Sequence, residues 1–270
     1  MTNVWVLYNR TRLSVNRWFA ERLVGALCER GADARLVVAD TSEELPSDLP
    51  EFVVNRSADS KMAAQLQGRG FRLWNNAEIT RICNDKYLTY LTMEETGIHS
   101  LPSQLVTSEN ISEVSASFPS VLKSRDGHGG TEVFLVHDQK ELEEAFDRIG
   151  KPTALLQRAA ADLGKDLRVY VLGRKIIAAM LRYSETDFRS NFSLGGKAKR
   201  CEVVPPEVIR QVDVITDRFR FGLAGIDFIF DRGKPVFNEI EDAVGTRMLY
   251  AQTDLDIAAI YADYILNCPD

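Results

Sequence analysis

Three acidic residues near the carboxyl end of the chain have a spacing that suits a metal site. They lie in two apolar segments, GIDFIF (225–230) and VFNEIE (236–241), which are typical of neighbouring β-strands. Glu239 and Glu241 are two residues apart, so both side chains project from one face of their strand. Asp227 joins that face if it pairs across the strands with Glu239. The two segments therefore predict three carboxylates on one surface.

The opposite face of the same strands supports this pairing. A five-residue connection from Asp231 to Pro235 would set Asp227 across from Glu239, and it would keep Pro235, which has no N–H to donate, out of the ladder. The same register turns a set of apolar residues to the other face: Ile226, Phe228, Phe230, Val236 and Ile240. A shift by one residue would break both properties, because side chains alternate between the two faces.

Three carboxylates on a small surface repel one another unless a cation lies between them. Their hard oxygen atoms suit Mg²⁺ or Mn²⁺, and magnesium held by few carboxylates commonly takes phosphate oxygens as its other ligands. The alternative is a solvated acidic edge of a sheet. The consistently apolar opposite face favours the metal site.

A glycine-rich segment offers a site for phosphate. Lys123 ends a predicted strand over 120–123, and the segment after it contains three glycines in four positions: Gly127, Gly129 and Gly130. Backbone N–H groups at glycines can approach an anion closely. The segment lacks the G-K-[ST] of a Walker motif, and an ordinary turn is an equal alternative. His128, in the same segment, is more typical of a solvated loop residue than of a catalytic base.

Further charged residues could act on a phosphoryl group. Lys86 lies at the start of a predicted helix, and Asp166 and Arg168 open a predicted strand. Arg189 and Asn191 belong to the polar segment TDFRSN, where an arginine could neutralise a transferring phosphoryl group or an acyl phosphate. A surface lysine and a salt-bridged loop are the plain alternatives.

Residues 1–80 are expected to form a small parallel α/β unit. Short apolar strands alternate there with helices, the strands covering 4–8, 36–39, 52–55 and 71–74 and the helices 14–30 and 61–67. The loop after the first strand lacks glycine, which disfavours a dinucleotide site. Open α/β sheets bind ligands where their strands end, so four residues are candidates for a substrate pocket, with ordinary loop residues as the alternative: Asn9, Arg10, Asn55 and Arg56.

The remainder of the chain is typical of an α+β arrangement rather than a continued parallel sheet. A helix capped by Asn84 is expected to run to Gly97. After it, strands are expected at 103–106, 120–123, 133–135, 154–157, 167–172 and 175–181, and helices at 141–149, 207–221 and 255–266.

Composition narrows the classes of function. The 270 residues include 33 Lys+Arg and 39 Asp+Glu, a net charge of −6, which argues against a nucleic-acid-binding or membrane-surface protein. No apolar run approaches the roughly 20 residues of a membrane span. The four cysteines form no C-x-x-C pair, so the sequence indicates a reduced, cytoplasmic protein without a zinc site or a disulfide scaffold.

The order of these motifs resembles that of the ATP-grasp superfamily, in particular the ribosomal-S6-modification and glutathione-synthetase type of ligase. The resemblance rests on NDK (84–86), VLK (121–123), DGHGG (126–130), LLQR (155–158), KDLRVYVLG (165–173), DFRSN (187–191), GIDF (225–228) and NEIE (238–241). It implies an α+β ATP-grasp fold in which lid and C-terminal domains clamp ATP. The expected domains are a small parallel α/β domain over 1–80, a helix and lid domain over 81–155, and a C-terminal domain with the metal site over 156–270.

The resemblance also implies roles for individual residues. Lys86 and Lys123 would contact the nucleotide, the loop 126–130 would close on the triphosphate, and Asp166 would lie near the ribose. The adenine pocket would be lined from the hinge by Gln157, Arg158, Ala159 and Ala160. Arg189 would meet the γ-phosphate and the acyl phosphate, with Asn191 beside it in the catalytic set. Mg²⁺ (or Mn²⁺) would be held by Asp227 and Glu239, with Glu241 at the third ligand position.

Two residues depart from the family's pattern. Arg158 follows the hinge glutamine directly, where an acidic residue is common, and Glu241 stands where asparagine is common. The extra negative charge of Glu241 should tighten metal binding. We hypothesise that Arg247 offsets that charge or binds a substrate carboxylate. Arg168 is a further candidate for substrate contact.

The implied activity is that of an ATP-dependent, ADP-forming carboxylate–amine (or thiol) ligase that acts through an acyl phosphate. ATP and Mg²⁺ (or Mn²⁺) are the implied cofactors. The partners would be a small-molecule or peptide carboxylate and an amine acceptor, with no nucleic acid and no membrane, and a homo-oligomer is a family-level expectation. Two alternatives stay open: an ATP-dependent kinase on the same scaffold, and a non-catalytic nucleotide-binding module.

Overall fold

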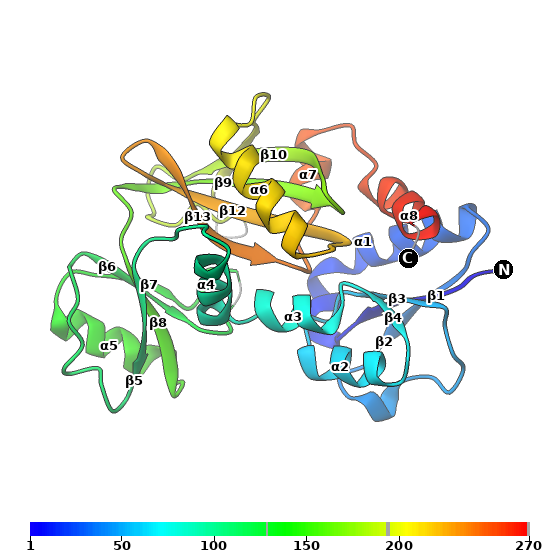
Figure 1. Cartoon of the computed structure of the whole chain (residues 1–270), viewed down its shortest axis with the longest axis horizontal. Coiled ribbons are helices and arrows are strands. Elements are labelled where there is room, and N and C mark those ends of the chain that lie inside the picture. Colours follow the sequence, from blue (N-terminus) through cyan, green and yellow to red (C-terminus); the bar gives the residue numbers. More distant parts are fainter. Residues whose placement is uncertain (128, 193–194, 269–270) are drawn as a thin grey trace.

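The computed structural model describes residues 1–127, 129–192 and 195–268, and its strands form three sheets (Figure 1). The first sheet is parallel, with the order β2-β1-β3-β4. It consists of β1 (Asn3–Tyr8), β2 (Asp33–Val38), β3 (Phe52–Asn55) and β4 (Arg72–Trp74), connected by α1 (Arg10–Glu29), the short helix η1 (Ser42–Glu44) and α2 (Ser60–Gly68). The parallel α/β unit predicted at the start of the chain is therefore present.

The second sheet is small and antiparallel, with the order β5-β8-β6-β7. Its strands are β5 (Ser103–Thr107), β6 (Ser120–Ser124), β7 (Val133–Val136) and β8 (Thr153–Arg158), and α5 (Gln139–Ile149) packs against it. The helix buries the apolar stripe that its sequence predicts, Leu142, Ala145, Phe146 and Ile149. The expected boundary between the lid domain and the C-terminal domain lies after residue 155. It falls inside strand β8, which runs to Arg158 within this sheet.

The third sheet is antiparallel, and its order is β11-β10-β9-β12-β13. Its strands are β9 (Asp162–Leu172), β10 (Lys175–Tyr183), β11 (Lys197–Arg200), β12 (Leu223–Asp231) and β13 (Lys234–Glu241). Alternate residues of β9 enter two different cores. Val169 and Val171 pack with α6 (Pro206–Arg218), whereas Tyr170 and Leu172 pack with α1 and with α8 (Ile257–Asn267). Helices therefore cover both faces of this sheet.

The end of the chain returns to its beginning. After α7 (Arg247–Gln252), helix α8 lies alongside α1 (Figure 1), and two ion pairs join the helices or their ends: Arg22 with Asp256, and Arg30 with Asp263. The first and third sheets consequently share one core, and the first unit is held rigidly against the sheet that carries the acidic residues. In the described part of the chain, no helix has the length and apolar character needed to cross a bilayer.

The helix expected from Asn84 to Gly97 is in fact two helices, α3 (Ala77–Cys83) and α4 (Lys86–Glu95). Asn84 ends α3, and Asp85 is the residue that caps α4, with its carboxylate accepting from the N–H groups of Tyr87 and Leu88. The prediction that Asn84 caps the helix is wrong. Both residue types favour the capping position, so the sequence pattern alone does not decide between neighbours.

The hairpin of β12 and β13 confirms one prediction and corrects another. Asp227 pairs with Glu239 as expected. Pro235, however, lies inside β13 opposite Phe230, and the register shifts between Asp227 and Phe228, which leaves Asn238 as the extra residue of a β-bulge. The shorter turn and the bulge shift the register in opposite directions, so the three carboxylates still project from the same face of the hairpin. On the core face of β13, Phe237 and Ile240 are buried, whereas the expected Val236 is only half-buried.

Candidate functional site

A cavity lies where the second and third sheets meet, and it collects most of the residues singled out in the sequence. Its described lining includes Lys86, Lys123, Gly127, Gly129, Gly130, Gln157, Arg158, Ala160, Asp166, Arg189, Asn191, Glu239 and Glu241. They come from α4, β6, the loop after β6, β8, β9, the segment after β10, and β13. Residues far apart in the chain thus converge on one space.

The three predicted metal ligands form one cluster. Asp227, Glu239 and Glu241 each offer a carboxylate oxygen, and these oxygens lie within 4.8 Å of one another. Asp227 is buried, whereas Glu239 and Glu241 are partly exposed on the cavity side. Burial raises the pKa of Glu239 above its ordinary value, and the charges of Lys86 and Lys123 oppose that shift.

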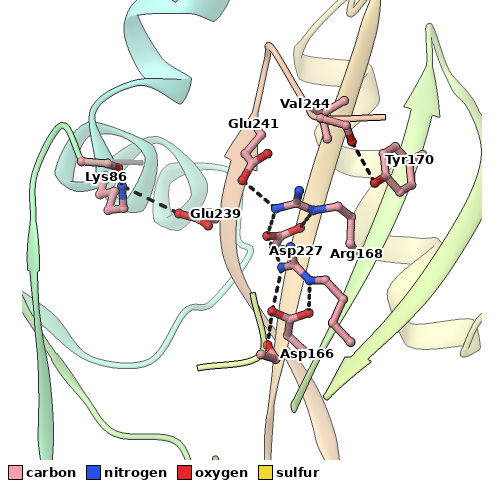
Figure 2. Close-up of polar contacts among 12 residues, drawn as sticks. Lys86, Asp166, Arg168, Tyr170, Asp227, Glu239, Glu241 and Val244 are labelled. Carbon is pink, nitrogen blue, oxygen red and sulfur yellow. Dashed lines mark hydrogen bonds and ion pairs between the residues drawn. The ribbon is translucent and has the colours of Figure 1, made fainter. Parts of the chain in front are cut away.

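Two buried arginines, Arg168 and Arg182, bind this cluster, and Figure 2 shows Arg168 against Asp227 and Glu241. Arg168 donates to both oxygens of Asp227, at 2.7 and 2.6 Å, and to Glu241 at 2.6 Å. Arg182 donates to both oxygens of Asp166, at 2.6 and 2.7 Å, and to Asp227 at 2.7 Å. Burial opposes ionisation of Asp227, but the charges of the two arginines hold its pKa below the ordinary value.

This arginine network bears on the roles expected of Arg168 and Asp166. Arg168, a candidate for substrate contact, does not line the cavity among the described residues and is occupied with carboxylates. Asp166 accepts from Arg182 and from Ser190 at 2.6 Å, so its oxygens belong to the same network. Sequence reasoning missed Arg182. The available signal was its cross-strand pairing with Asp166, which the β9–β10 hairpin fixes.

The cluster has the donors that a hard divalent cation requires. Asp227 Oδ1 and Glu241 Oε1 each accept a single hydrogen bond, and within the described residues Glu239 accepts none. A carboxylate oxygen has two lone pairs, so coordination capacity remains on each side chain. Oxygen donors with a net negative charge fit Mg²⁺ or Mn²⁺.

Two lysines lie on the other side of the cluster. Lys86 Nζ donates to the backbone oxygen of Gly127 and lies 3.9 Å from Glu239 Oε2 (Figure 2). Lys123 is buried, and its Nζ donates to Gln157 Oε1 at 3.0 Å and to Asn238 Oδ1 at 3.1 Å. The bulge at Asn238 thus supplies a lysine partner. Both ammonium groups face the cavity, where they could neutralise phosphate oxygens.

Burial of Lys123 predicts a pH dependence of stability. Burial lowers the pKa of Lys123 from 10.5 to about 8. Between those values the unfolded chain binds a proton that the folded chain does not, so this group makes the free energy of unfolding rise with pH. Without nucleotide or metal, we expect the unfolding free energy of the wild type relative to Lys123→Met to increase by about 3 kcal/mol from pH 7 to 10.5.

Urea unfolding across that pH range measures the effect. Lys140→Met, at an exposed position on α5, is the control and should run parallel to the wild type. If the difference between wild type and Lys123→Met does not change with pH, the buried lysine is not titrating as the structure requires.

The glycine segment is anchored at both ends. Lys151 Nζ binds Ser124 Oγ, Asp126 and Glu132 at 2.7 to 2.9 Å, which ties together the residues on either side of the turn. Gly129 and Gly130 have φ of +72° and +78°, values that side chains rarely adopt, so these positions require glycine. His128 lies outside the described residues.

The segment after β10 contacts the glycine segment directly. Arg189 donates to the backbone oxygen of Gly130 at 2.9 Å and is held by Asp187. Arg189 and Asn191 both line the cavity. An arginine fixed at this position can meet an anion that approaches the lysines and the glycine backbone.

The end of strand β8 and the two residues after it supply the residues expected at the hinge. Gln157 and Ala160 line the cavity, and Ala159 is buried. Arg158, which departs from the family's pattern, pairs with Asp231 of β12 at 2.7 and 3.3 Å. The departure is therefore compensated by an acidic partner that holds the guanidinium in place.

The substrate candidates of the first sheet do not line the cavity among the described residues. Asn9 caps α1, Arg10 is exposed and pairs with Asp40 and Glu44, Asn55 binds Thr80, and Arg56 is buried against Tyr8 and Val244. The first helix begins directly after β1, at Arg10 rather than at the predicted Ser14, and a substrate role for these four residues stays a prediction. That early start carries a different arginine, Arg12, into the cavity lining. Arg247 is exposed at the start of α7 and also lies outside the described lining.

Comparisons with known proteins bear on the fold. The sequence profile of the RimK-like ATP-grasp domain matches residues 85–265. Similar relatives include the uncharacterized protein MG011 of Mycoplasma genitalium, 28% identical over 96% of this chain and 90% of the relative. Human N-acetylaspartylglutamate synthase A is 30% identical over 81% of this chain and 58% of its own length. The crystal structure of a RimK domain ATP-grasp protein from Sphaerobacter thermophilus superposes with a TM-score of 0.73 at 23% identity, covering 97% of this chain and 99% of that one. The fold is the one that the sequence motifs predicted.

Proposed function

The chain belongs to the RimK-like ATP-grasp family, and we propose that it joins a substrate carboxylate to an amine through an acyl phosphate, with ATP converted to ADP and phosphate. Members of this family are ligases that form amide bonds, and ATP with Mg²⁺ (or Mn²⁺) is their cofactor. The observation that carries the proposal is that Lys86, Lys123 and Arg189 line one cavity with Glu239 and Glu241, whose carboxylates cluster with that of the buried Asp227. The lysines and the arginine can neutralise a triphosphate from several sides, and the carboxylates would hold a divalent cation that adds to this.

In the proposed first step, an oxygen of the substrate carboxylate attacks the γ-phosphorus of ATP. The bond from phosphorus to the bridging oxygen breaks, and ADP takes the electron pair. Lys86 and Lys123 hold the phosphates, and Arg189 stabilises charge on the transferring group. Asp227, Glu239 and Glu241 would hold the divalent cations, which supply further neutralisation of the phosphoryl oxygens.

In the second step, an amine attacks the acyl carbon, phosphate leaves with the electron pair of the C–O bond, and the amine loses a proton. The glycine segment, held against Arg189 by the contact to Gly130, keeps water from the acyl phosphate. Asp166 acts indirectly, because its bonds to Arg182 fix an arginine that supports Asp227. We assign it to this network rather than to the ribose.

The proposed substrates are a small-molecule or peptide carboxylate and an amine acceptor. The name of the human relative describes an amide product made from N-acetylaspartate and glutamate. That product chemistry supports testing L-glutamate first as the amine and N-acetylated amino acids as carboxylates for this chain.

An ADP-release assay with a matrix of carboxylates and amines, with Mg²⁺ present, tests the proposal. We expect ADP release to require both substrates and mass spectrometry to show a product equal to their sum less one water. A stable phosphorylated product from a hydroxyl substrate would instead identify a kinase. Nucleotide binding without substrate-stimulated ADP release across a broad panel would identify a non-catalytic module.

A further inference from the structure

The guanidinium of one arginine in the cavity makes no hydrogen bond within the described residues. Arg12, in the first turn of α1, lines the cavity together with Asn84, Asp242 and Glu241. Its guanidinium makes no hydrogen bond or ion pair within the part of the chain that the structure describes, whereas its backbone N–H is fixed by the Asn9 cap at 2.7 Å. Arg12 is therefore rigidly placed at its base and free at its tip.

The other arginines at the cavity or behind it already bind carboxylates in the described part of the chain. Arg168 and Arg182 bind carboxylates, Arg158 pairs with Asp231, and Arg189 is held by Asp187. A half-buried guanidinium without an acceptor has lost part of its hydration without compensation, which favours binding of an anion.

The charges nearest Arg12 are mixed, because Asp242 and Glu241 attract its guanidinium whereas Arg56 repels it. Asp242 accepts from Asn84 at 3.0 Å, and Glu241 is shared with Arg168. Arg56 lies behind Arg12 closely enough to repel it, and Arg56 Nη1 is buried without a hydrogen-bond partner in the described residues. An anion at Arg12 would relieve that repulsion.

We propose that Arg12 binds a substrate carboxylate that takes no part in the reaction, so that one of the two substrates must carry a free carboxylate besides any group that reacts. The planar fork of arginine matches a carboxylate with two parallel hydrogen bonds. In the proposed function the nucleotide would take the part of the cavity lined by β8, the lysines and the glycine segment, whereas Arg12 comes from the first unit of the chain. This inference rests on the proposed function, and it adds a residue that sets specificity.

Steady-state kinetics with paired substrates tests the role. Arg12→Gln should raise KM for the substrate that carries the carboxylate by about 10- to 100-fold and leave KM for ATP unchanged. Arg12→Lys should recover part of the affinity, because it retains the charge but not the fork. Arg17→Gln, at an exposed position of the same helix, is the matched control and should behave as the wild type.

Amidated substrates identify which carboxylate is bound. With L-glutamate as amine, one arm replaces it by L-glutamine or by its α-amide, and the other arm replaces N-acetyl-L-aspartate by N-acetyl-L-asparagine or N-acetyl-L-alanine. In one arm the amide replaces the carboxylate that Arg12 binds. There the wild type should bind the amide as weakly as Arg12→Gln binds the acid, and the variant should bind the acid and the amide with equal affinity. The proposal is overturned if, relative to the wild type, Arg12→Gln lowers the affinity for the acid and the affinity for its amide by the same factor.

A binding measurement separates this proposal from the ligase activity. If the wild type releases no ADP with any pair, the proposed function fails. Calorimetric titration of the protein loaded with magnesium and a non-hydrolysable ATP analogue, using L-glutamate and N-acetyl-L-aspartate separately, still reads the Arg12 site. Binding that Arg12→Gln abolishes supports the site. Absence of binding to both compounds, or unchanged binding in the variant, refutes it.

Discussion

Glu239→Gln should lower the rate of ADP release by about 10³-fold while the protein stays folded. Glu239 has the most available carboxylate of the acidic cluster, because within the described residues it accepts no hydrogen bond and lies 3.9 Å from Lys86. Glutamine keeps the shape of the side chain and removes the charge that a divalent cation needs. Burial already disfavours the ionised form of Glu239, so the neutral side chain should not destabilise the fold.

The measurement is the dependence of ADP release on Mg²⁺ concentration, with thermal unfolding as the check on folding. Glu202→Gln, whose side chain is 72% exposed, is the control and should match the wild type. If the rate and the magnesium dependence of Glu239→Gln are close to those of the wild type, the assignment of a metal site to this cluster is wrong.

Arg168→Met should destabilise the protein by about 3 to 5 kcal/mol, the cost typical of breaking a buried ion pair from one side. Arg168 and Asp227 have side chains only 7% and 1% exposed, and Arg168 also binds Glu241. Removal of the guanidinium leaves Asp227 to Arg182 alone and leaves Glu241 without that donor. The two carboxylates then repel each other at close range.

Urea unfolding gives the free energy for this comparison. Arg174→Met is the matched control, because Arg174 lies in the turn between β9 and β10, is 70% exposed and pairs only with Asp217 among the described residues. An exposed pair contributes at most about 1 kcal/mol. If Arg168→Met is as stable as the wild type, the buried arginines do not support the acidic cluster in the way described.

The acidic hairpin was predictable because period-two alternation acts on short segments. Asp227, Glu239 and Glu241 share a face through local geometry alone. The predicted pairing of Asp227 with Glu239 is correct although the predicted turn is too long. The sequence did not reveal the bulge at Asn238, since a bulge and a shortened turn shift the register in opposite directions and cancel. The bulge matters, because it gives Lys123 a second partner.

The contacts that the sequence could not predict are those made between units far apart in the chain. Arg182 and Arg168 were visible as charges, but their burial depends on which face of the sheet the helices cover. Arg12 was missed because the first helix begins earlier than its apolar pattern suggests. Local capping by Asn9 decides that start, and a polar residue at this position is equally typical of a loop.

Anomalous X-ray scattering from manganese tests the central claim most directly. Crystals grown with Mn²⁺ and a non-hydrolysable ATP analogue should show metal peaks between the phosphate oxygens and the carboxylates of Asp227, Glu239 and Glu241. Metal peaks that contact the phosphates but none of these three side chains would contradict the account.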